Sequence, residues 1–337
     1  MHWERLLKRI TMNRKAPAKE GNLNSDFCEA LIELSNWEKS VNKNQFKQNA
    51  YRKAAQTLAG LDYRIKDGSE AKKLNGVGEK IAQKIDEMIE TGKIAKLETI
   101  LSDESYVAVN LLQRVAGIGP AKAQELVSAG ITFLEKLRNN LDQLTSAQRI
   151  GLKYLEDFEQ RIPRREIEKI VVMVRKCVRS VDRKYMMMVC GSYRRGAHTS
   201  GDIDILLTHP DHLTEEPGDH LARVVRSLTE EQVITDTLSQ GSSKFMGVCR
   251  LSSDLPARRL DIRLIPHHQF YCGVLYFTGS DSFNRAMRTW ALDRGFTLNE
   301  YCLRPMVGGK PQEPLPVSSE IEIFHYLEFP YKQPKDR

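Results

Sequence analysis

Apolar residues in the first part of the chain recur every three or four positions, which is the spacing of a helix with one buried face. Between residues 27 and 59 this pattern includes Leu31, Leu34, Val41 and Leu58. The first hundred residues are therefore predicted to be all-helical.

The pattern changes beyond a polar, proline-containing break at residues 161–165, which is typical of a domain boundary. An amphipathic helix is predicted from Ile167 to Val181. Short apolar runs then predict strands over residues 185–190, 203–208, 245–251 and 260–265, helices near 221–231 and 282–294, and short strands near 296–303. A helical part followed by a mixed part predicts an α+β multidomain protein.

A short segment is repeated within the helical part. Residues 74–82, LNGVGEKIA, are echoed by residues 115–123, VAGIGPAKA. Each copy places an apolar residue between two glycines before a helix, and the free N–H groups of a helix start can hold a phosphate. A single copy is equally well explained as a tight turn, but two copies in a basic region favour binding to a nucleic-acid backbone.

Composition narrows the class of partner. The 337 residues contain 51 Lys and Arg against 44 Asp and Glu, a net charge of +7, and most of this surplus lies in the first hundred residues. A basic chain favours a polyanionic partner. Apolar residues make up 41%, as in globular proteins, and no apolar run is long enough to span a bilayer. Six scattered cysteines without zinc-ligand spacing favour a reducing compartment.

Carboxylates cluster in the mixed part of the chain. Asp202 and Asp204 share one face of a predicted strand, because successive side chains of a strand point to opposite faces. Asp261, in a later strand, is a third candidate ligand, and Gly191-Ser192 precedes the pair by nine residues. An isolated Asp-x-Asp is more often a solvated strand face, but the full set favours Mg²⁺ and two-metal nucleotidyl transfer.

Longer segments carry a resemblance to a known family. The Gly-Ser-x9-Asp-x-Asp arrangement resembles the nucleotidyltransferase superfamily, and GSYRRGAHTSGDIDILLTH, RLDIRLIP and YCGVLYFTGSD resemble X-family DNA polymerases of the beta type. The similarity extends from Met12 to Arg337. It implies a polymerase that fills short gaps in base-excision repair and carries a 5′-deoxyribose-phosphate lyase.

The resemblance also implies a division into five segments. These are an N-terminal extension (1–12), a helical lyase domain with the first helix-hairpin-helix (13–100), a DNA-binding domain with the second (101–162), a catalytic palm (163–266) and a C-terminal domain that binds the nascent base pair (267–337).

In the palm and C-terminal domain, the resemblance assigns metal binding and catalysis to Asp202, Asp204 and Asp261. The residues that it assigns to the deoxynucleoside triphosphate are Arg161, Ser192, Arg195, Gly201, Asp202, Tyr276, Phe277, Gly279, Asp281 and Asn284. It assigns DNA contacts to Lys244, Arg259 and Arg288.

In the helical region, the resemblance makes Lys84 the lysine that forms a Schiff base with the abasic sugar. Lys80 lies one helical turn earlier, and a neighbouring cation favours the neutral, nucleophilic amine. Without the resemblance, these lysines are better explained as a solvated DNA-binding stripe. Phe46 stands where the family often has histidine. The DNA contacts implied in this region are Phe46, Lys47, Tyr51, Lys80, Gly76, Gly78, Gly117 and Gly119.

The resemblance further implies a monovalent cation, Na⁺ or K⁺, at each hairpin. Its ligands would be the backbone carbonyls of Lys72, Leu74 and Val77 in the first hairpin and of Gln113, Val115 and Ile118 in the second.

The expected partners are gapped or nicked DNA with a 5′-phosphate, deoxynucleotides, and repair proteins such as a strand-break scaffold, an abasic endonuclease and a DNA ligase. The expected protein is a monomer without membrane contact, in the nucleus, with the cytoplasm and, less strongly, the mitochondrion as alternatives. Two other functions stay open: a template-independent nucleotidyltransferase, and a scaffold that binds gapped DNA without catalysis.

Overall fold

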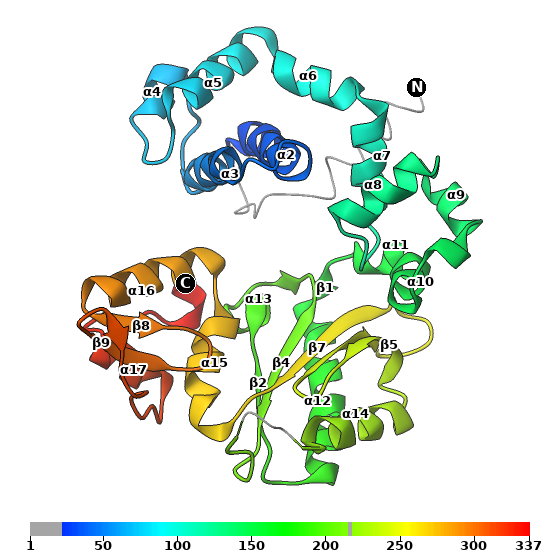
Figure 1. Ribbon diagram of the computed structural model, residues 1–337, viewed down its shortest axis with the longest axis vertical. Coiled ribbons are helices and arrows are strands. Elements are labelled where there is room, and N and C mark those ends of the chain that lie inside the picture. The colour runs from blue at the N-terminus through cyan, green and yellow to red at the C-terminus, as the bar shows by residue number, and fades with distance from the viewer. Residues whose placement is uncertain (1–21, 215–217) are drawn as a thin grey trace. The chain divides into compact units, whose positions relative to one another are not determined.

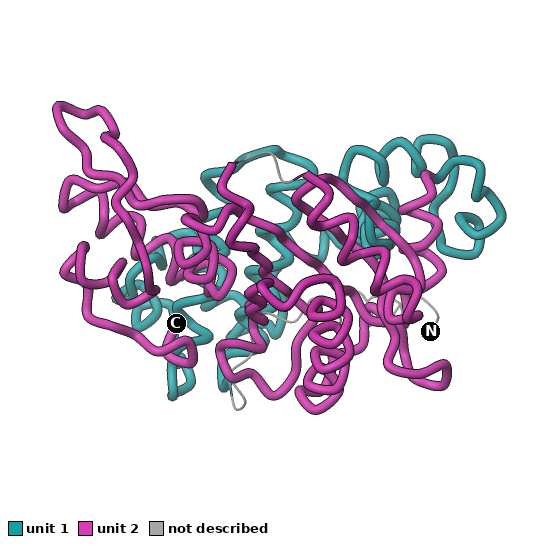
Figure 2. The backbone as a smooth tube through the Cα atoms, turned by 90° about the horizontal axis from the view of Figure 1, so that it is seen from below, with its two compact units in different colours: residues 1–144 teal, residues 145–337 magenta. Residues whose placement is uncertain are grey.

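The computed structural model describes residues 22–214 and 218–337. The chain divides into two compact units, with the division between Leu144 and Thr145 (Figures 1 and 2). The expected N-terminal extension, residues 1–12, lies outside the described residues. The expected boundary at residue 162 differs from this division, because residues 145–162 belong to the second unit. Tyr154 in this segment packs with Val248 and Ala257 of the second unit. The five-segment division stays a prediction.

The described part of the first unit is helical throughout, as the sequence pattern predicts. Its α-helices are α2 (Ser25–Ser40), α3 (Gln45–Ala59), α4 (Gly68–Lys72), α5 (Glu79–Thr91), α6 (Ala95–Ser102), α7 (Glu104–Leu112), α8 (Pro120–Ser128) and α9 (Leu134–Arg138), followed by the short helix η1 (Leu141–Gln143). The core packs Phe27, Leu31 and Leu34 of α2 against Leu58 of α3 and Ile85 of α5.

The two copies of the repeated segment have the same backbone geometry. Gly76 and Gly117 both have a left-handed backbone, with φ of 91° and 88°, which only glycine adopts without strain. Gly78 and Gly119 are the N-caps of α5 and α8, with nearly identical φ and ψ angles. The repeat in the sequence is therefore a repeat of structure, a hairpin before each helix.

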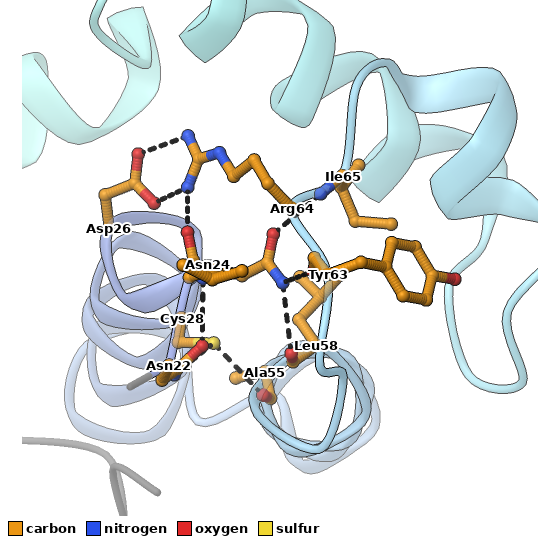
Figure 3. Close-up of polar contacts among 10 residues, drawn as sticks. Asn22, Asn24, Asp26, Cys28, Ala55, Leu58, Tyr63, Arg64 and Ile65 are labelled. Atoms are coloured by element: carbon orange, nitrogen blue, oxygen red, sulfur yellow. Dashed lines mark hydrogen bonds and ion pairs between the residues drawn. The ribbon is translucent and has the colours of Figure 1, made fainter. Parts of the chain in front are cut away.

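A buried asparagine joins the start of α2 to the segment that follows α3 (Figure 3). The Asn24 side chain is fully buried and donates to the carbonyl oxygens of Tyr63 (2.8 Å) and Leu58 (3.4 Å). Its Oδ1 accepts from the backbone N–H of Ile65 at 2.9 Å. Arg64 beside it pairs with Asp26, so this segment is fixed by polar contacts at several points.

We expect Asn24→Ala to lower the free energy of unfolding by about 3 kcal/mol. The substitution leaves a buried N–H and two carbonyl groups without their hydrogen-bond partner, and each such group costs roughly 1–3 kcal/mol. Urea unfolding of the full chain, followed by circular dichroism, measures the change. Asn49→Ala, at an exposed position of α3, is the matched control and should change stability by less than about 0.5 kcal/mol. Equal values for the two variants would contradict the structural role of Asn24.

The second unit is built on a five-stranded sheet with the strand order β2-β4-β7-β6-β5. Its strands are β2 (Met186–Val189), β4 (Ile203–Thr208), β5 (Ile234–Gln240), β6 (Lys244–Cys249) and β7 (Arg258–Leu264). β4 and β7 are parallel and adjacent, whereas the other neighbours are antiparallel. Four of these strands match predicted runs.

The fifth strand, β5, was not predicted from the sequence. It lies at the sheet edge, and its residues ITDTLSQ are mostly polar and exposed, so it lacks the apolar run on which strand prediction depends. A short pair, β1 (Ile162–Pro163) with β3 (Thr199–Ser200), was also missed because two residues give no pattern.

Helices cover both faces of the sheet. The helices α12 (Arg164–Val181) and α14 (His220–Glu230) share one core with Ile203, Ile205 and Leu207 of β4. On the opposite face, Leu206 of β4 packs against Phe270 and Val274 of α15 (Phe270–Thr278). Asp204 of β4 lies between the two isoleucines in the sequence, and its side chain is therefore on the α15 face.

The C-terminal part adds a second small core. Phe283 and Met287 of α16 (Asp281–Asp293) pack with Phe324 of α17 (Glu320–Tyr326). The remaining elements of this unit are α10 (Ser146–Lys153), α11 (Leu155–Phe158), α13 (Gly191–Arg194), η2 (His267–Gln269), β8 (Phe296–Leu298), β9 (Leu303–Val307), β10 (Lys310–Pro311) and η3 (Pro334–Asp336). The predicted α+β multidomain class is confirmed. Among the described helices, none combines the length and apolar character needed to cross a membrane.

Candidate active site and nucleic-acid interface

Three aspartates come together on adjacent strands. Asp204 of β4 and Asp261 of β7 are direct partners in the parallel register, and Asp202 immediately precedes β4. One carboxylate oxygen from each lies within 4.8 Å of the other two. Among the described residues, these three aspartates form the one group of acidic, histidine or cysteine side chains that lie close enough together to share a metal ion.

A glycine turn lies against this cluster. Gly191 begins α13 with a left-handed φ of 57°, and a Cβ at this position would collide with the Asp204 carboxylate. The neighbouring Cys190 N–H donates to the backbone oxygen of Asp204 at 2.8 Å. Glycine is required here because the turn must approach the carboxylate closely.

The cluster carries unbalanced negative charge. Burial, together with the carboxylates of Asp202 and Asp261, raises the pKa of Asp204 to about 7. Burial also raises the pKa of Asp261, although Arg259, which donates to its Oδ2 at 2.9 Å, opposes the rise. Asp261 Oδ1 is buried and has no hydrogen-bond partner. Close carboxylates with an unused buried oxygen fit a hard divalent cation.

The residues expected to contact a triphosphate surround this turn. Ser192 Oγ donates to Ser200 Oγ at 2.9 Å, and Arg195 donates to the Thr278 carbonyl at 2.6 Å. Arg161 donates to the Thr199 carbonyl at 2.6 Å, and its guanidinium lies beside Gly201. Ser192 and Arg161 thus contact β3, whereas Arg195 contacts the last residue of α15.

The residues expected to contact the nucleotide sugar and base lie at the junction of α15 and α16. Asn284 donates to the Tyr276 carbonyl at 2.8 Å, and Arg288 lies 5.0 Å from the centre of the Tyr276 ring. Phe277 lines a cavity of about 130 Å³ together with Lys244, Asp204 and Asp261. Gly279 follows α15, and Asp281 begins α16 and pairs with Arg285. This junction therefore borders the aspartate cluster.

In the first unit, the predicted lyase residues lie on α3 and α5. Lys84 is half-buried on α5 and Lys80 is exposed one turn earlier. Tyr51 is buried in the same core as Ile81 and Ile85, which flank Lys84 on its helix. Lys47 is exposed on α3, and its neighbour Phe46 is 84% exposed, which is unusual for a large apolar side chain.

The sequence interpretation missed a buried acid in this region. Glu38 is fully buried and accepts from Lys96 and Asn42, each at 2.9 Å. Burial opposes its ionisation, but these hydrogen bonds and the charge of Lys47 hold the pKa of Glu38 below its usual value. Burial and the Glu38 charge together raise the pKa of Tyr51. No sequence motif marks Glu38, because its charged partner Lys96 is 58 residues away in the chain.

The predicted cation ligands lie in the two hairpins. The Leu74 carbonyl accepts from Val77 N–H at 3.2 Å, and the Val115 carbonyl accepts from Ile118 N–H at 3.0 Å in the equivalent way. Lys72 and Gln113 occupy corresponding places at or just after the end of the preceding helix. A carbonyl oxygen has two lone pairs, so each of these accepting oxygens retains capacity for a cation.

Comparison with known proteins agrees with this geometry. Family models match in chain order: a helix-hairpin-helix domain at residues 22–94, the fingers domain of DNA polymerase lambda at 110–159, the DNA polymerase beta palm at 161–267 and the DNA polymerase beta thumb at 273–337. The DNA polymerase lambda of Rattus norvegicus is 35% identical over 332 residues, and that of Arabidopsis thaliana is 31% identical over 336. The chain belongs to the X family of DNA polymerases.

The X-family chain is shorter than these relatives. Each alignment covers 95% of this chain, but only 57% of the rat protein and 63% of the Arabidopsis protein. Similarity to both beta-type models and lambda relatives places the chain in the X family without deciding between these members.

The X-family site also contains a polar network that the sequence interpretation missed. Arg194 donates through both terminal nitrogens to Glu320, at 3.0 and 2.9 Å, and to Thr278 Oγ1 at 2.6 Å. Arg337 also donates to Glu320 at 2.5 Å. Although burial opposes it, these two arginines lower the pKa of Glu320. The network joins α13 to the end of α15 and to α17.

The raised pKa of Asp204 predicts a pH-dependent stability. The pKa of Asp204 is near 3.8 in the unfolded chain and about 7 in the folded protein. Between these two pH values, the metal-free folded protein holds a proton that the unfolded chain has released. The free energy of unfolding should therefore fall as pH rises through this window. Asp204→Asn removes the effect and should be more stable than the unchanged protein by about 2–4 kcal/mol at pH 8.

Thermal and urea unfolding in a metal chelator, from pH 4 to pH 8, checks this expectation. The difference between the two proteins should be near zero at the low end and grow with pH. Added Mg²⁺ should reduce the difference, because a cation stabilises the ionised cluster. A difference that is constant across pH would show that the Asp204 carboxyl is not responsible.

Proposed function

We propose that this chain is a template-directed DNA polymerase that fills short gaps, and that its helical unit is a 5′-deoxyribose-phosphate lyase. The observation that carries the polymerase proposal is the group of Asp202, Asp204 and Asp261 beside the Gly191 turn. The names of the relatives, which are DNA polymerases, support the same reaction class.

The finer proposal for the cofactor is two Mg²⁺ ions held by the three aspartates. When bound, such ions stabilise the attacking and leaving oxygens of an in-line displacement. Asp261 would help to activate the primer 3′-hydroxyl, and Ser192 and Arg195 would hold triphosphate oxygens through a hydroxyl and a guanidinium. Tyr276, Phe277 and Asn284 orient the sugar and base, so selection of the correct pair depends on closure of this junction.

For the lyase, we propose that Lys84 attacks C1′ of the abasic sugar. Its half-buried position on α5, beside the core that contains Tyr51, keeps the amine accessible while limiting its hydration. Exposed Lys47 and Lys80 would contact DNA phosphates, and exposed Phe46 would stack on a base.

We further propose that the hairpins hold DNA phosphates through a Na⁺ or K⁺ ion on their carbonyl oxygens. The support is the common backbone geometry of the two hairpins. The proposed setting is the nucleus, with base-excision-repair proteins such as a strand-break scaffold, an abasic endonuclease and a DNA ligase as partners. These proposals on partners and setting rest on the family resemblance alone.

The test is insertion of one nucleotide into duplex DNA with a one-nucleotide gap and a 5′-phosphate, in the presence of Mg²⁺. Each of the four deoxynucleotides is offered separately. Insertion of only the templated nucleotide is expected. Insertion regardless of template would favour a template-independent nucleotidyltransferase, and binding without insertion would favour a scaffold.

A further inference from the structure

One cysteine has surroundings that differ from those of the others. All six cysteines are described; five are buried, and Cys302 is half-exposed. Burial raises the pKa of Cys190, Cys249 and Cys272 to about 12, so none of these three thiols is suited to be the first to react with an oxidant. Cys302 instead accepts a hydrogen bond from the Arg304 guanidinium, with 3.2 Å between Nε and Sγ. A cation in contact with sulfur stabilises the negative charge of a thiolate.

Cys302 has a second cysteine close by. Cys272 of α15 and Cys302, just before β9, both line a cavity of about 500 Å³. The chain on each side of Cys302 lies against α15. The Glu300 carbonyl oxygen lies 3.6 Å from the position that a Cβ on Gly273 would occupy. The backbone N–H of Leu303 donates a hydrogen bond to the Cys272 sulfur, which opposes the larger effect of burial on the pKa of this thiol.

We propose that Cys302 is a peroxide-reactive thiol and that Cys272 is its resolving partner in a reversible disulfide between α15 and the β8–β9 turn. The Cys302 thiolate attacks one oxygen of hydrogen peroxide: an S–O bond forms, the O–O bond breaks, and hydroxide leaves. The Cys272 sulfur then attacks the resulting sulfenic acid: an S–S bond forms, the S–O bond breaks, and the oxygen leaves as water with the thiol proton. Both sulfurs are oxidised and peroxide is reduced.

The disulfide would restrict the junction of α15 and α16, where the residues proposed to contact the nucleotide lie. Cys272 lies one helical turn before Tyr276 on α15. Glu300, in the turn that Cys302 ends, pairs with Arg288 at 3.5 Å. A covalent link would fix this turn to the helix and slow the adjustment of Tyr276 and Arg288 around an incoming nucleotide. This regulatory consequence rests on the proposed polymerase function, whereas the thiol chemistry does not.

The test treats the 337-residue protein with a limiting amount of hydrogen peroxide and maps its peptides without reduction. Free thiols should fall from six to four, with Cys272 and Cys302 in one linked peptide pair, and dithiothreitol should restore them. Cys272→Ser should leave a sulfenic acid on Cys302 that dimedone traps. Arg304→Gln should slow formation of the same pair.

Three results would contradict the proposed Cys272–Cys302 disulfide. The first is that Cys302→Ser loses as many free thiols as the unchanged protein. The others are a disulfide between different cysteines, and a sulfenic acid that persists on Cys302 of the unchanged protein. If Cys272→Ser fails to fold, the peptide map of the unchanged sequence decides alone. Gap insertion gives the separate readout. Reversible slowing that is absent in Cys302→Ser supports regulation, and unchanged insertion by the fully linked protein overturns it. Absence of insertion by the reduced protein would instead contradict the polymerase proposal.

Discussion

Replacing Asp261 with asparagine is expected to reduce nucleotide insertion by about a thousandfold or more. The substitution keeps the size of the side chain but removes one of three carboxylates that lie together on β4 and β7. Loss of a metal-ligand charge removes several kcal/mol of transition-state stabilisation, and each ~1.4 kcal/mol is a factor of ten in rate. Single-turnover insertion into one-nucleotide-gapped DNA measures the loss.

The fold of this variant should remain intact. Asp261 Oδ1 has no hydrogen-bond partner, and removal of its charge relieves the repulsion on Asp204. Affinity for gapped DNA and lyase activity should therefore stay close to those of the unchanged protein. Asp254→Asn, at an exposed turn position, removes an equal charge and is the matched control. Insertion by the Asp261 variant at the rate of this control would contradict the assigned role.

The aspartate cluster could be predicted from the sequence because strand periodicity is local. Alternation alone placed Asp202 and Asp204 away from the isoleucines that enter the core, and the structure confirms that arrangement. The direct pairing of Asp204 with Asp261 could not be read in this way. It depends on β7 lying next to β4 in parallel, after the chain has passed through β5 and β6.

Contacts between distant segments explain most of what sequence reasoning missed. Arg194 and Glu320 are 126 residues apart, and neither residue carries a pattern that identifies the other as its partner. Glu38 and Lys96 are 58 residues apart and likewise meet only after the helices pack. The edge strand β5 was missed for a different reason, since an exposed strand needs few apolar residues. Local periodicity predicts faces of elements, whereas pairing between elements depends on the packed fold.

Replacing Lys84 with arginine is expected to lower the yield of borohydride-trapped complex on 5′-deoxyribose-phosphate DNA by about a hundredfold or more, a loss of roughly 3 kcal/mol. A Schiff base forms only from a neutral primary amine, and a guanidinium stays charged. The positive charge on α5 is retained, so affinity for DNA should change little. Gap insertion should persist, because the aspartates lie in the other unit.

Lys80→Arg is the matched control for this variant, because Lys80 lies one turn earlier on the same helix and is exposed. It should retain trapping, since it changes the same side chain in the same way without removing the proposed nucleophile. Trapping that survives in Lys84→Arg but is lost in Lys80→Arg would move the nucleophile to Lys80. Loss in both variants with DNA affinity unchanged would mean that trapping needs both primary amines, because arginine retains the positive charge at each position.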